Sequence, residues 1–219
     1  MELRILKAIV SLSDNPRYTA AVHFINDSMV NGMNADEQER FTKLFFDYPE
    51  FKDRYEEART PQSEFEHERF SEFPPNTLGY HYAKFMNHHK FSVYWYPVMK
   101  EISPVHFARN HQYLTHDVLH TITGFDGNSM GEIGLQGFYT GQQAPNPTAM
   151  TVFTAASLHN LKASDPKENT KLLDYITEGY LMGKSAQRVI FRRWEDDWNT
   201  DISELREQLG IRPHVQNAY

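Results

Sequence analysis

The residues best suited to chemistry are His116, Asp117 and His120, followed after an eleven-residue gap by Glu132. Positions three and four apart lie on one face of a helix, so a helix here would bring two imidazoles and a carboxylate within one turn of each other. Imidazole nitrogen and carboxylate oxygen are common ligands of divalent metals. The spacing therefore predicts a metal site, and the same four residues are the predicted catalytic residues.

Glu132 is predicted to supply the fourth ligand from a second helix. Gly124 and the pair Asp126 and Gly127 are typical of a helix end and a turn, so a helix starting near Ser129 can return Glu132 to the first helix. A competing interpretation is a capping box from Ser129 to Glu132, in which the carboxylate bonds to the start of its own helix. One carboxylate rarely does both.

The helix that carries the motif is predicted over about 104–122, with one apolar and one polar face. The polar face holds ligand and proton-transfer side chains instead of paired Lys and Glu, which favours a site over simple solvation. Arg109 lies two turns before the first motif histidine and could bind a substrate carboxylate or phosphate, although an ordinary ion pair fits equally well. Tyr113, and Gln136 in the next helix, are the other predicted substrate contacts.

Composition narrows the class of protein. The 219 residues carry 22 Lys and Arg against 29 Asp and Glu, a net charge of −7, without a dense basic stripe, so we expect no nucleic-acid partner. The sequence has no Cys, which leaves nitrogen and oxygen as metal ligands. The mean hydropathy is −0.64 and no apolar run is long enough to span a bilayer, so we expect peripheral membrane contact at most. The N-terminus resembles neither a signal nor a transit peptide, which favours the cytoplasm of a bacterium.

Helical periodicity dominates the chain, and the sequence predicts an all-α fold, a single multi-helix domain over 1–219. A helix ended by Gly32 is predicted near the N-terminus, and Asn34 is predicted to cap the next helix. Residues 93–97, VYWYP, could pass as a strand, whereas 59–75 is typical of a long loop. Fifteen Phe and twelve Tyr suit an apolar cavity or a bulky core.

A long helix is predicted over about 167–191. It carries Leu173, Ile176 and Tyr180 on one stripe. Gly183 would allow a neighbouring element to approach this helix closely.

The motif also resembles a known family. HDVLH with Glu132 after eleven residues resembles the HDxxH-x11-E signature of the coenzyme Q biosynthesis protein 4 family. The segments FPPNTLGYHYAKFM, GEIGLQGF, ITEGYLMGKSA, RRWEDDW and LREQLGI are similar to further blocks of that family, so the resemblance covers most of the chain from about Phe73 onward. It implies an all-helical fold, an apolar pocket for a polyprenylated ring precursor, membrane association, and a metal site at His116, Asp117, His120 and Glu132.

The resemblance further implies a role in ubiquinone synthesis. The family is associated with oxidative removal of the C1 carboxyl from a polyprenyl-hydroxybenzoate and with organising the other biosynthetic enzymes into a complex. A divalent ion could act there as a Lewis acid on the ring phenolate or carboxylate. Zinc is the first expectation, and iron, manganese or magnesium suit related ligand sets. Because no dinucleotide fingerprint is present, dioxygen or a redox-active metal would have to accept the electrons.

Two other classes of function stay open. A non-catalytic scaffold would bind the prenyl lipid without turning it over. A metal-dependent hydrolase is the third class, since HDxxH resembles HExxH, but Asp117 falls about one methylene short of the glutamate base of those enzymes. A homodimer is the generic expectation for a helical protein with spare apolar surface.

Overall fold

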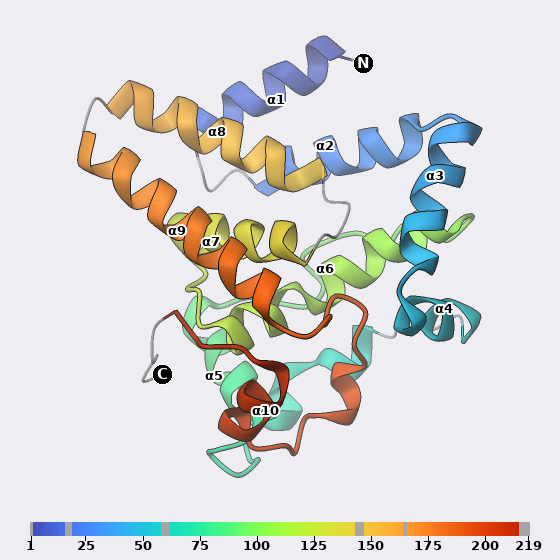
Figure 1. Ribbon diagram of the computed structural model, residues 1–219, viewed down its shortest axis with the longest axis vertical. Helices are drawn as coiled ribbons and strands as arrows, with labels where there is room; N and C mark the ends of the chain where they lie inside the picture. Colours follow the sequence, from blue (N-terminus) through green and yellow to red (C-terminus); the bar gives the residue numbers. More distant parts are fainter. Residues whose placement is uncertain (1, 16–18, 58–61, 143–146, 164–165, 215–219) are drawn as a thin grey trace. The chain divides into compact units, whose positions relative to one another are not determined.

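The computed structural model describes residues 2–15, 19–57, 62–142, 147–163 and 166–214 (Figure 1). These residues form helices and connecting segments, and their only strand-like feature is an isolated antiparallel bridge between Thr77 and Asp201. The predicted all-α fold class is confirmed.

The helix bounds place the motif on one long helix and the predicted fourth ligand on the next. The α-helices are α1 (Glu2–Asp14), α2 (Thr19–Gly32), α3 (Ala35–Phe46), α4 (Pro49–Glu56), α5 (Leu78–His89), α6 (Pro104–Thr123), α7 (Ser129–Gly141), α8 (Pro147–Ala163), α9 (Pro166–Ser185) and α10 (Ile202–Leu209). Short 3-10 helices are η1 (Gln62–Phe65), η2 (His67–Phe70) and η3 (Trp194–Asp196).

The described chain divides into two compact units. The first takes residues 1–40 and 128–184, and the second takes 41–127 and 185–219. Each unit is built from two separate stretches of sequence, so neither unit is a contiguous domain. The single domain over 1–219 stays a prediction.

In the first unit, α8 is the common neighbour of the other helices. It packs against α1, α2 and α7, and α1 also packs against α2. Leu12, Ala21 and Ala155 form the buried centre of this packing. The side-chain ring of His159 contacts the Ser13 carbonyl at 2.8 Å and so ties α8 to the end of α1.

Helices α7 and α9 approach each other through glycine. A Cβ atom built on Gly179 would lie 1.9 Å from the carbonyl oxygen of Gly134, and one built on Gly183 would lie 2.2 Å from that of Phe138. Any side chain at these positions would overlap with backbone. The predicted close approach at Gly183 is therefore confirmed.

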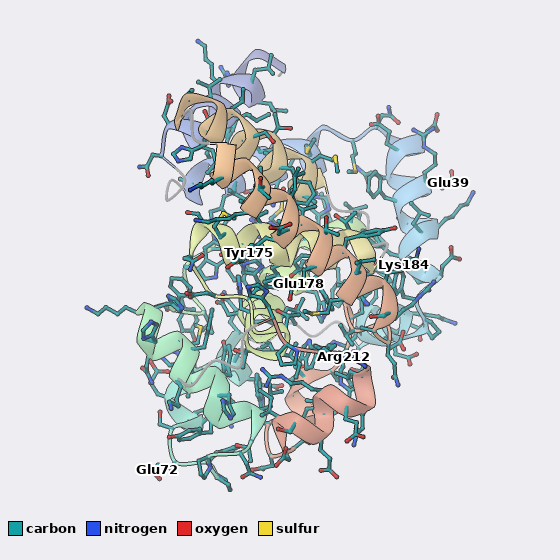
Figure 2. All side chains as sticks on the ribbon, turned by 60° about the vertical axis from the view of Figure 1, so that its left-hand side comes forward. Glu39, Glu72, Tyr175, Glu178, Lys184 and Arg212 are labelled. Atoms are coloured by element: carbon teal, nitrogen blue, oxygen red, sulfur yellow. The ribbon has the colours of Figure 1, made fainter. Side chains whose placement is uncertain are left out.

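The buried face of α9 differs from the predicted stripe. Leu172, Gly179, Met182 and Gly183 are buried, whereas Leu173 is 62% exposed and Tyr180 is 39% exposed. The exposed side of the helix also carries Glu178 and Lys184, which Figure 2 labels along α9. Of the predicted stripe, Ile176 is half-buried, whereas Leu173 and Tyr180 lie outside the packed face, because glycine, which contributes no hydrophobic side chain, occupies much of that face. The helix also ends at Ser185, before the predicted residue 191.

Aromatic side chains form much of the core of the second unit. The ring of Phe51 lies 4.7 Å from that of Phe191 and 5.7 Å from that of Phe107 on α6, between centroids. A second cluster joins Trp198 to Phe70, at 4.5 Å, and to Tyr82 of α5, at 5.2 Å. These contacts hold α4, α5, α6 and the segment before α10 in one unit.

Helix α10 secures the end of α6. The last carbonyls of a helix lack partners within it. Arg206 donates from Nε to the carbonyl of Ile122 and from Nη2 to that of Thr121, both at 2.9 Å. The backbone N–H of His214 bonds to the Thr123 carbonyl, also at 2.9 Å. The carboxyl end of the motif helix is thereby fixed.

Local predictions of the sequence had mixed outcomes. Asn34 and Glu37 form a reciprocal capping box at the start of α3, which confirms the predicted cap. Residues 93–97 are irregular and not a strand. The predicted loop over 59–75 contains η1 and η2 in its described part, because buried Phe65 and Phe70 anchor it to the core.

Candidate metal centre

Helix α6 is buried on nearly all sides, so its polar face is not a face in contact with solvent. Seventeen of its twenty residues are buried. Among the motif residues, Asp117 is 6% exposed and His120 is 1% exposed, while His116 is half-buried. A solvated polar face is therefore excluded, since burying a carboxylate and imidazoles is costly unless they are paired or bind a ligand.

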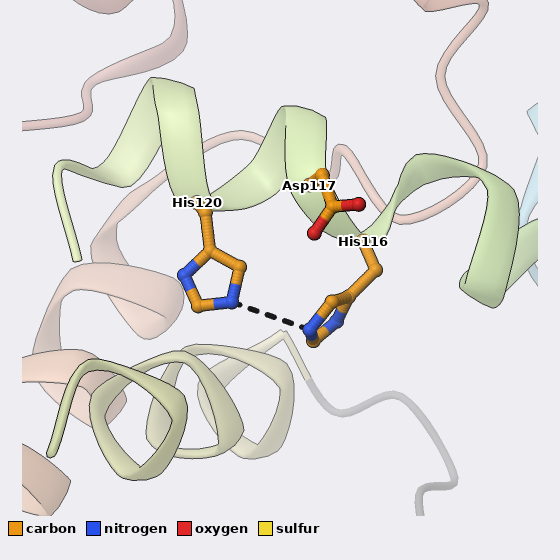
Figure 3. A group of neighbouring side chains, drawn as sticks. All are labelled: His116, Asp117 and His120. Atoms are coloured by element: carbon orange, nitrogen blue, oxygen red, sulfur yellow. Dashed lines mark hydrogen bonds between the residues drawn. The ribbon is translucent and has the colours of Figure 1, made fainter. Parts of the chain in front are cut away.

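The side chains of His116, Asp117 and His120 converge (Figure 3). One ligand atom from each lies within 4.8 Å of the others. The Nε2 atoms of the two imidazoles are 3.2 Å apart, the contact drawn as a dashed line in Figure 3. The helical spacing thus brings these three side chains together as predicted.

A main-chain carbonyl fixes which nitrogen of His120 can bind a ligand. Nδ1 of His120 lies 2.9 Å from the carbonyl oxygen of Phe125. A carbonyl only accepts hydrogen bonds, so Nδ1 carries the proton and Nε2 carries the lone pair that faces His116. Such a bond on the outer nitrogen is typical of metal-binding histidines.

The geometry fits one divalent ion. Two nitrogens bound to one zinc ion at about 2.0–2.1 Å lie roughly 3.3 Å apart in a tetrahedral site. The observed separation of 3.2 Å between the Nε2 atoms of His116 and His120 agrees with this value. Two nitrogens and the Asp117 carboxylate suit zinc first, and iron or manganese second.

Aromatic rings flank both histidines. The ring of Phe85 stacks on that of His120, with centroids 5.4 Å apart and an angle of 18° between the planes. Trp95, which is 37% exposed, lies 6.4 Å from the ring of His116. Sequence analysis missed both residues. The aromatic stretch at 93–97 was the available signal for Trp95, but it has no periodicity that relates it to α6.

Arg109 is held by internal partners. Its Nη1 donates to the carbonyl of Pro97 at 2.7 Å and to Oδ1 of Asn110 at 3.1 Å. Its guanidinium lies 4.4 Å from the ring centroid of Tyr113, and the residue is 5% exposed. These contacts favour a role in anchoring the segment before α6. Substrate binding by Arg109 stays a prediction.

Tyr113 is part of an aromatic stack under that segment. Its ring lies 5.1 Å from that of Tyr96, nearly parallel, and 5.4 Å from that of Trp95. Burial raises the pKa of Tyr96 and outweighs the opposing effects of a hydrogen bond from Gln62 and the charge of Arg109. Tyr96 is therefore a neutral phenol, and the stack lies beside His116, whose ring centroid is 6.4 Å from that of Trp95. The predicted substrate contact of Tyr113 stays a prediction.

Glu132 and Gln136 lie on α7, in the first unit, whereas the clustered side chains of His116, Asp117 and His120 belong to the second. Oδ1 of Asn128 accepts from the backbone N–H groups of Met130 and Gly131, both at 3.0 Å, so Asn128 is the cap. The alternative capping box that starts at Ser129 is wrong. Glu132 is half-buried and Gln136 is 5% exposed. The fourth ligand and the Gln136 contact stay predictions.

The apolar lipid pocket also stays a prediction. A cavity of about 110 Å³ in the second unit is charged, and its lining residues are Arg54, Glu57, Glu64, Arg193, Glu195 and Asp196. Ion pairs hold its walls, including a 2.6 Å contact between Arg54 and Glu195. This cavity does not suit a prenyl chain.

Comparison with known proteins gives one consistent result. The family model described as Coenzyme Q (ubiquinone) biosynthesis protein Coq4 matches residues 55–214. A mitochondrial ubiquinone biosynthesis protein coq4 of Botryotinia fuckeliana is 30% identical over 65% of this chain and 50% of its own length. A mitochondrial homologue from Aedes aegypti is 26% identical over 63% of this chain and 50% of its own. The chain spans about half the length of these relatives.

A solved structure extends the likeness to the fold. The crystal structure of a candidate ubiquinone biosynthesis protein from Nostoc punctiforme has a TM-score of 0.76, with 25% identity over 95% of this chain and 97% of that one.

Two findings bear on location. In the part of the chain that the structure describes, every helix is too short or too polar to traverse a lipid bilayer. The relatives from Botryotinia fuckeliana and Aedes aegypti are named mitochondrial, which does not fit the predicted cytoplasmic location.

Proposed function

Because this chain belongs to the Coq4 family of coenzyme Q (ubiquinone) biosynthesis proteins, we propose that it acts in the synthesis of a ubiquinone-type quinone. It binds a polyprenylated hydroxybenzoate-like precursor and a divalent metal, and it catalyses the oxidative removal of the ring carboxyl at C1. The residues proposed to hold the metal are His116, Asp117 and His120, with Glu132 as the fourth ligand.

One observation carries this proposal. Two imidazole nitrogens 3.2 Å apart and a carboxylate converge on a buried helix, and the outer nitrogen of His120 is fixed by the Phe125 carbonyl. The converging carboxylate of Asp117 adds an oxygen ligand that a hydrogen bond between the two imidazoles alone does not need.

The reaction is an oxidation by two electrons. The bond from ring C1 to the carboxyl carbon breaks, carbon dioxide leaves, and water supplies a hydroxyl to C1. Dioxygen accepts the two electrons and two protons and is released as hydrogen peroxide. When bound, a divalent ion supplies Lewis acidity that stabilises the negative charge developing on the ring oxygens.

The side chains around the ion-binding residues have distinct tasks in this proposal. Phe85 stacks on His120 and excludes water from its inner side. Trp95 lies beside His116, where a partly exposed indole offers a face on which the substrate ring can stack. Arg109 holds the Pro97 carbonyl and thereby keeps Trp95 in place.

The apolar surface near the site supports binding of a lipid tail and of a membrane surface. Four large hydrophobic side chains of the segment before α6 are exposed: Tyr94 by 57%, Trp95 by 37%, Val98 by 47% and Ile102 by 68%. The four residues lie within nine positions of one segment, and exposed apolar surface is typical of interaction sites. Sedimentation with vesicles containing a polyprenyl lipid tests this surface: Ile102→Asp should weaken binding several-fold, while Leu173→Asp, on the exposed side of α9, should not.

Metal content is the first test of the site. Purified protein should contain about one divalent ion per chain by elemental analysis, with zinc expected. His116→Ala should lower the affinity for Zn²⁺ by more than about 100-fold, because losing a direct ligand costs more affinity than losing a residue that only bonds to a ligand. His81→Ala removes another half-buried histidine of the same unit and should leave the affinity unchanged. Equal zinc binding by both variants would disprove the site.

Turnover is the second test, and it separates an enzyme from a scaffold. The metal-loaded protein is supplied with a prenylated 4-hydroxybenzoate and dioxygen, and carbon dioxide, hydrogen peroxide and the hydroxylated ring are measured. Glu132→Gln should abolish turnover and leave lipid binding, detected by native mass spectrometry, intact. Bound lipid without turnover under any metal or oxygen condition would support the non-catalytic scaffold instead.

A further inference from the structure

The turn that follows α6 decides the state of His120. Gly124 ends the helix in a left-handed conformation, with φ of 77°. The next residue, Phe125, is fully buried, and its carbonyl oxygen lies 2.9 Å from Nδ1 of His120. The position of one peptide group in this turn therefore determines which nitrogen of His120 carries the proton.

A second histidine holds the same turn from α5. Nε2 of His89 contacts Oδ1 of Asp126 at 2.8 Å, and Asp126 directly follows Phe125. The side chain of His89 is 15% exposed and that of Asp126 is 40% exposed. The carboxylate thus links the last residue of α5 to the peptide that faces His120.

Packing leaves little room for the turn to move against His89. The ring of His89 stacks on Phe91, with centroids 5.0 Å apart and 22° between the planes. A Cβ atom built on Gly127 would lie 2.9 Å from the Phe91 ring and 3.2 Å from the His89 ring. The imidazole of His89 therefore fills the space beside the turn.

Phe85 connects the two histidines directly. Its ring centroid lies 4.7 Å from that of His89 and 5.4 Å from that of His120. The two imidazoles thus share one aromatic neighbour, and the contact between His89 and Asp126 holds the turn that bonds to the second imidazole.

We propose that His89 and Asp126 are a positioning pair that fixes the Phe125 carbonyl and thereby keeps the proton of His120 on Nδ1 and its lone pair on Nε2. Neither residue belongs to the proposed ligand set of His116, Asp117, His120 and Glu132. The consequence for metal binding rests on the proposed function, whereas the effect on the tautomer of His120 does not.

The test reads the tautomer in metal-free protein. Nitrogen chemical shifts of ¹⁵N-labelled histidine distinguish a protonated from an unprotonated ring nitrogen. In the unaltered protein, His120 should show one tautomer with the proton on Nδ1. In Asp126→Ala and in His89→Ala, the shifts should move toward the average of two tautomers.

Asp126→Asn is the rescue variant, because its amide oxygen takes the place of the carboxylate oxygen that Nε2 of His89 contacts at 2.8 Å and can accept from it. It should restore the single tautomer. His81→Ala, a half-buried histidine on the same helix, is the matched control and should leave His120 unchanged. Circular dichroism identifies any alanine variant that does not fold, and His89→Gln, which keeps a donor, is then compared with His89→Leu.

Zinc affinity gives the functional result. Disturbing an outer partner of a histidine ligand typically costs about 10–100-fold in metal affinity. Asp126→Ala should fall in this range, and Asp126→Asn should recover most of the loss. A single unchanged tautomer of His120 in both Asp126→Ala and His89→Ala would overturn the inference. If the unaltered protein bound no zinc, the proposed function would fail, but the tautomer comparison would still decide the positioning role.

Discussion

Helices α6 and α9 have the same length of twenty residues but opposite surfaces. On α6, polar side chains are buried, including Arg109, Asn110 and His120. On α9, large apolar side chains such as Leu173 are exposed, and glycines are buried. The neighbouring elements therefore decide which side of a helix is packed. Hydrophobic periodicity alone did not identify the packed side of α9.

The glycine contact is the strongest constraint on α9. In Gly179→Ala, the new Cβ would overlap with the Gly134 carbonyl, only 1.9 Å away. We expect a loss of about 3 kcal/mol or more in the free energy of unfolding, because backbone on both sides must shift. Urea denaturation measures the loss. Leu173→Ala, on the exposed side of the same helix, should change stability by less than about 0.5 kcal/mol, and a similar cost for both variants would refute the assigned packing.

Arg206 is the strongest polar constraint on α6. Arg206→Met would remove the donors to the carbonyls of Thr121 and Ile122. Both bonds are only partly buried, so each acceptor left without a partner should cost about 1–2 kcal/mol and the two together about 2–4 kcal/mol. Thermal or chemical unfolding measures this loss of stability. Arg212→Met makes the same substitution at an exposed arginine and is the control. If Arg212→Met costs as much, the end of α6 does not depend on these bonds.

His111 should make the stability of the protein depend on pH. Burial lowers its pKa to about 3, and Nε2 lies 2.9 Å from the carbonyl of Ile190. An unfolded histidine has a pKa near 6.5, so below that value the unfolded state takes up a proton that the folded state does not. This contribution to stability is complete above about pH 6.5 and decreases by about 1.4 kcal/mol per pH unit as the pH falls toward the folded pKa.

The measurement compares the unaltered protein with His111→Phe between pH 7.5 and 5.5. The phenyl ring suits a site bordered by the rings of Phe107 and Phe191. The variant should lose about 1.4 kcal/mol less than the unaltered protein over this range, since only about one pH unit lies below 6.5. Identical pH profiles would mean that His111 is not buried as a neutral ring.

The smallest expected effect distinguishes two caps of α7, the helix that packs against the glycines of α9. Asn128→Ala should cost about 1 kcal/mol, because two backbone N–H groups lose their acceptor. Ser129→Ala should cost less than about 0.5 kcal/mol, since Ser129 is already the first helical residue. If urea denaturation showed a larger loss of stability for Ser129→Ala than for Asn128→Ala, the capping box considered from the sequence would be correct instead.

The motif could be predicted from the sequence because its geometry is local. Residues three and four apart share a helix face whatever surrounds the helix, so His116, Asp117 and His120 converge as expected. The end of α6 was predictable for the same reason, since Gly124 adopts a positive φ directly after the helix. Asn34 caps α3 through contacts within four residues.

The surroundings of the motif were not predictable, because they depend on contacts distant in sequence. A main-chain carbonyl such as that of Phe125 has no signature in the sequence, and its contact with His120 depends on how the turn folds back. Asp126 lies 2.8 Å from His89 although 37 positions separate the two residues in the sequence. Arg109 was a candidate for substrate binding, but in the structure its guanidinium donates a hydrogen bond to the carbonyl of Pro97.

The sequence by itself determined the helical class, the family, and a ligand set that can converge, since periodicity, motif spacing and caps act over a few residues. The tertiary structure decided which polar groups are buried, which nitrogen of His120 carries the proton, and which face of α9 packs. These features depend on the position of backbone carbonyls and on the absence of side chains at glycine. Both affect hydrogen bonding and packing only when segments distant in the sequence come into contact.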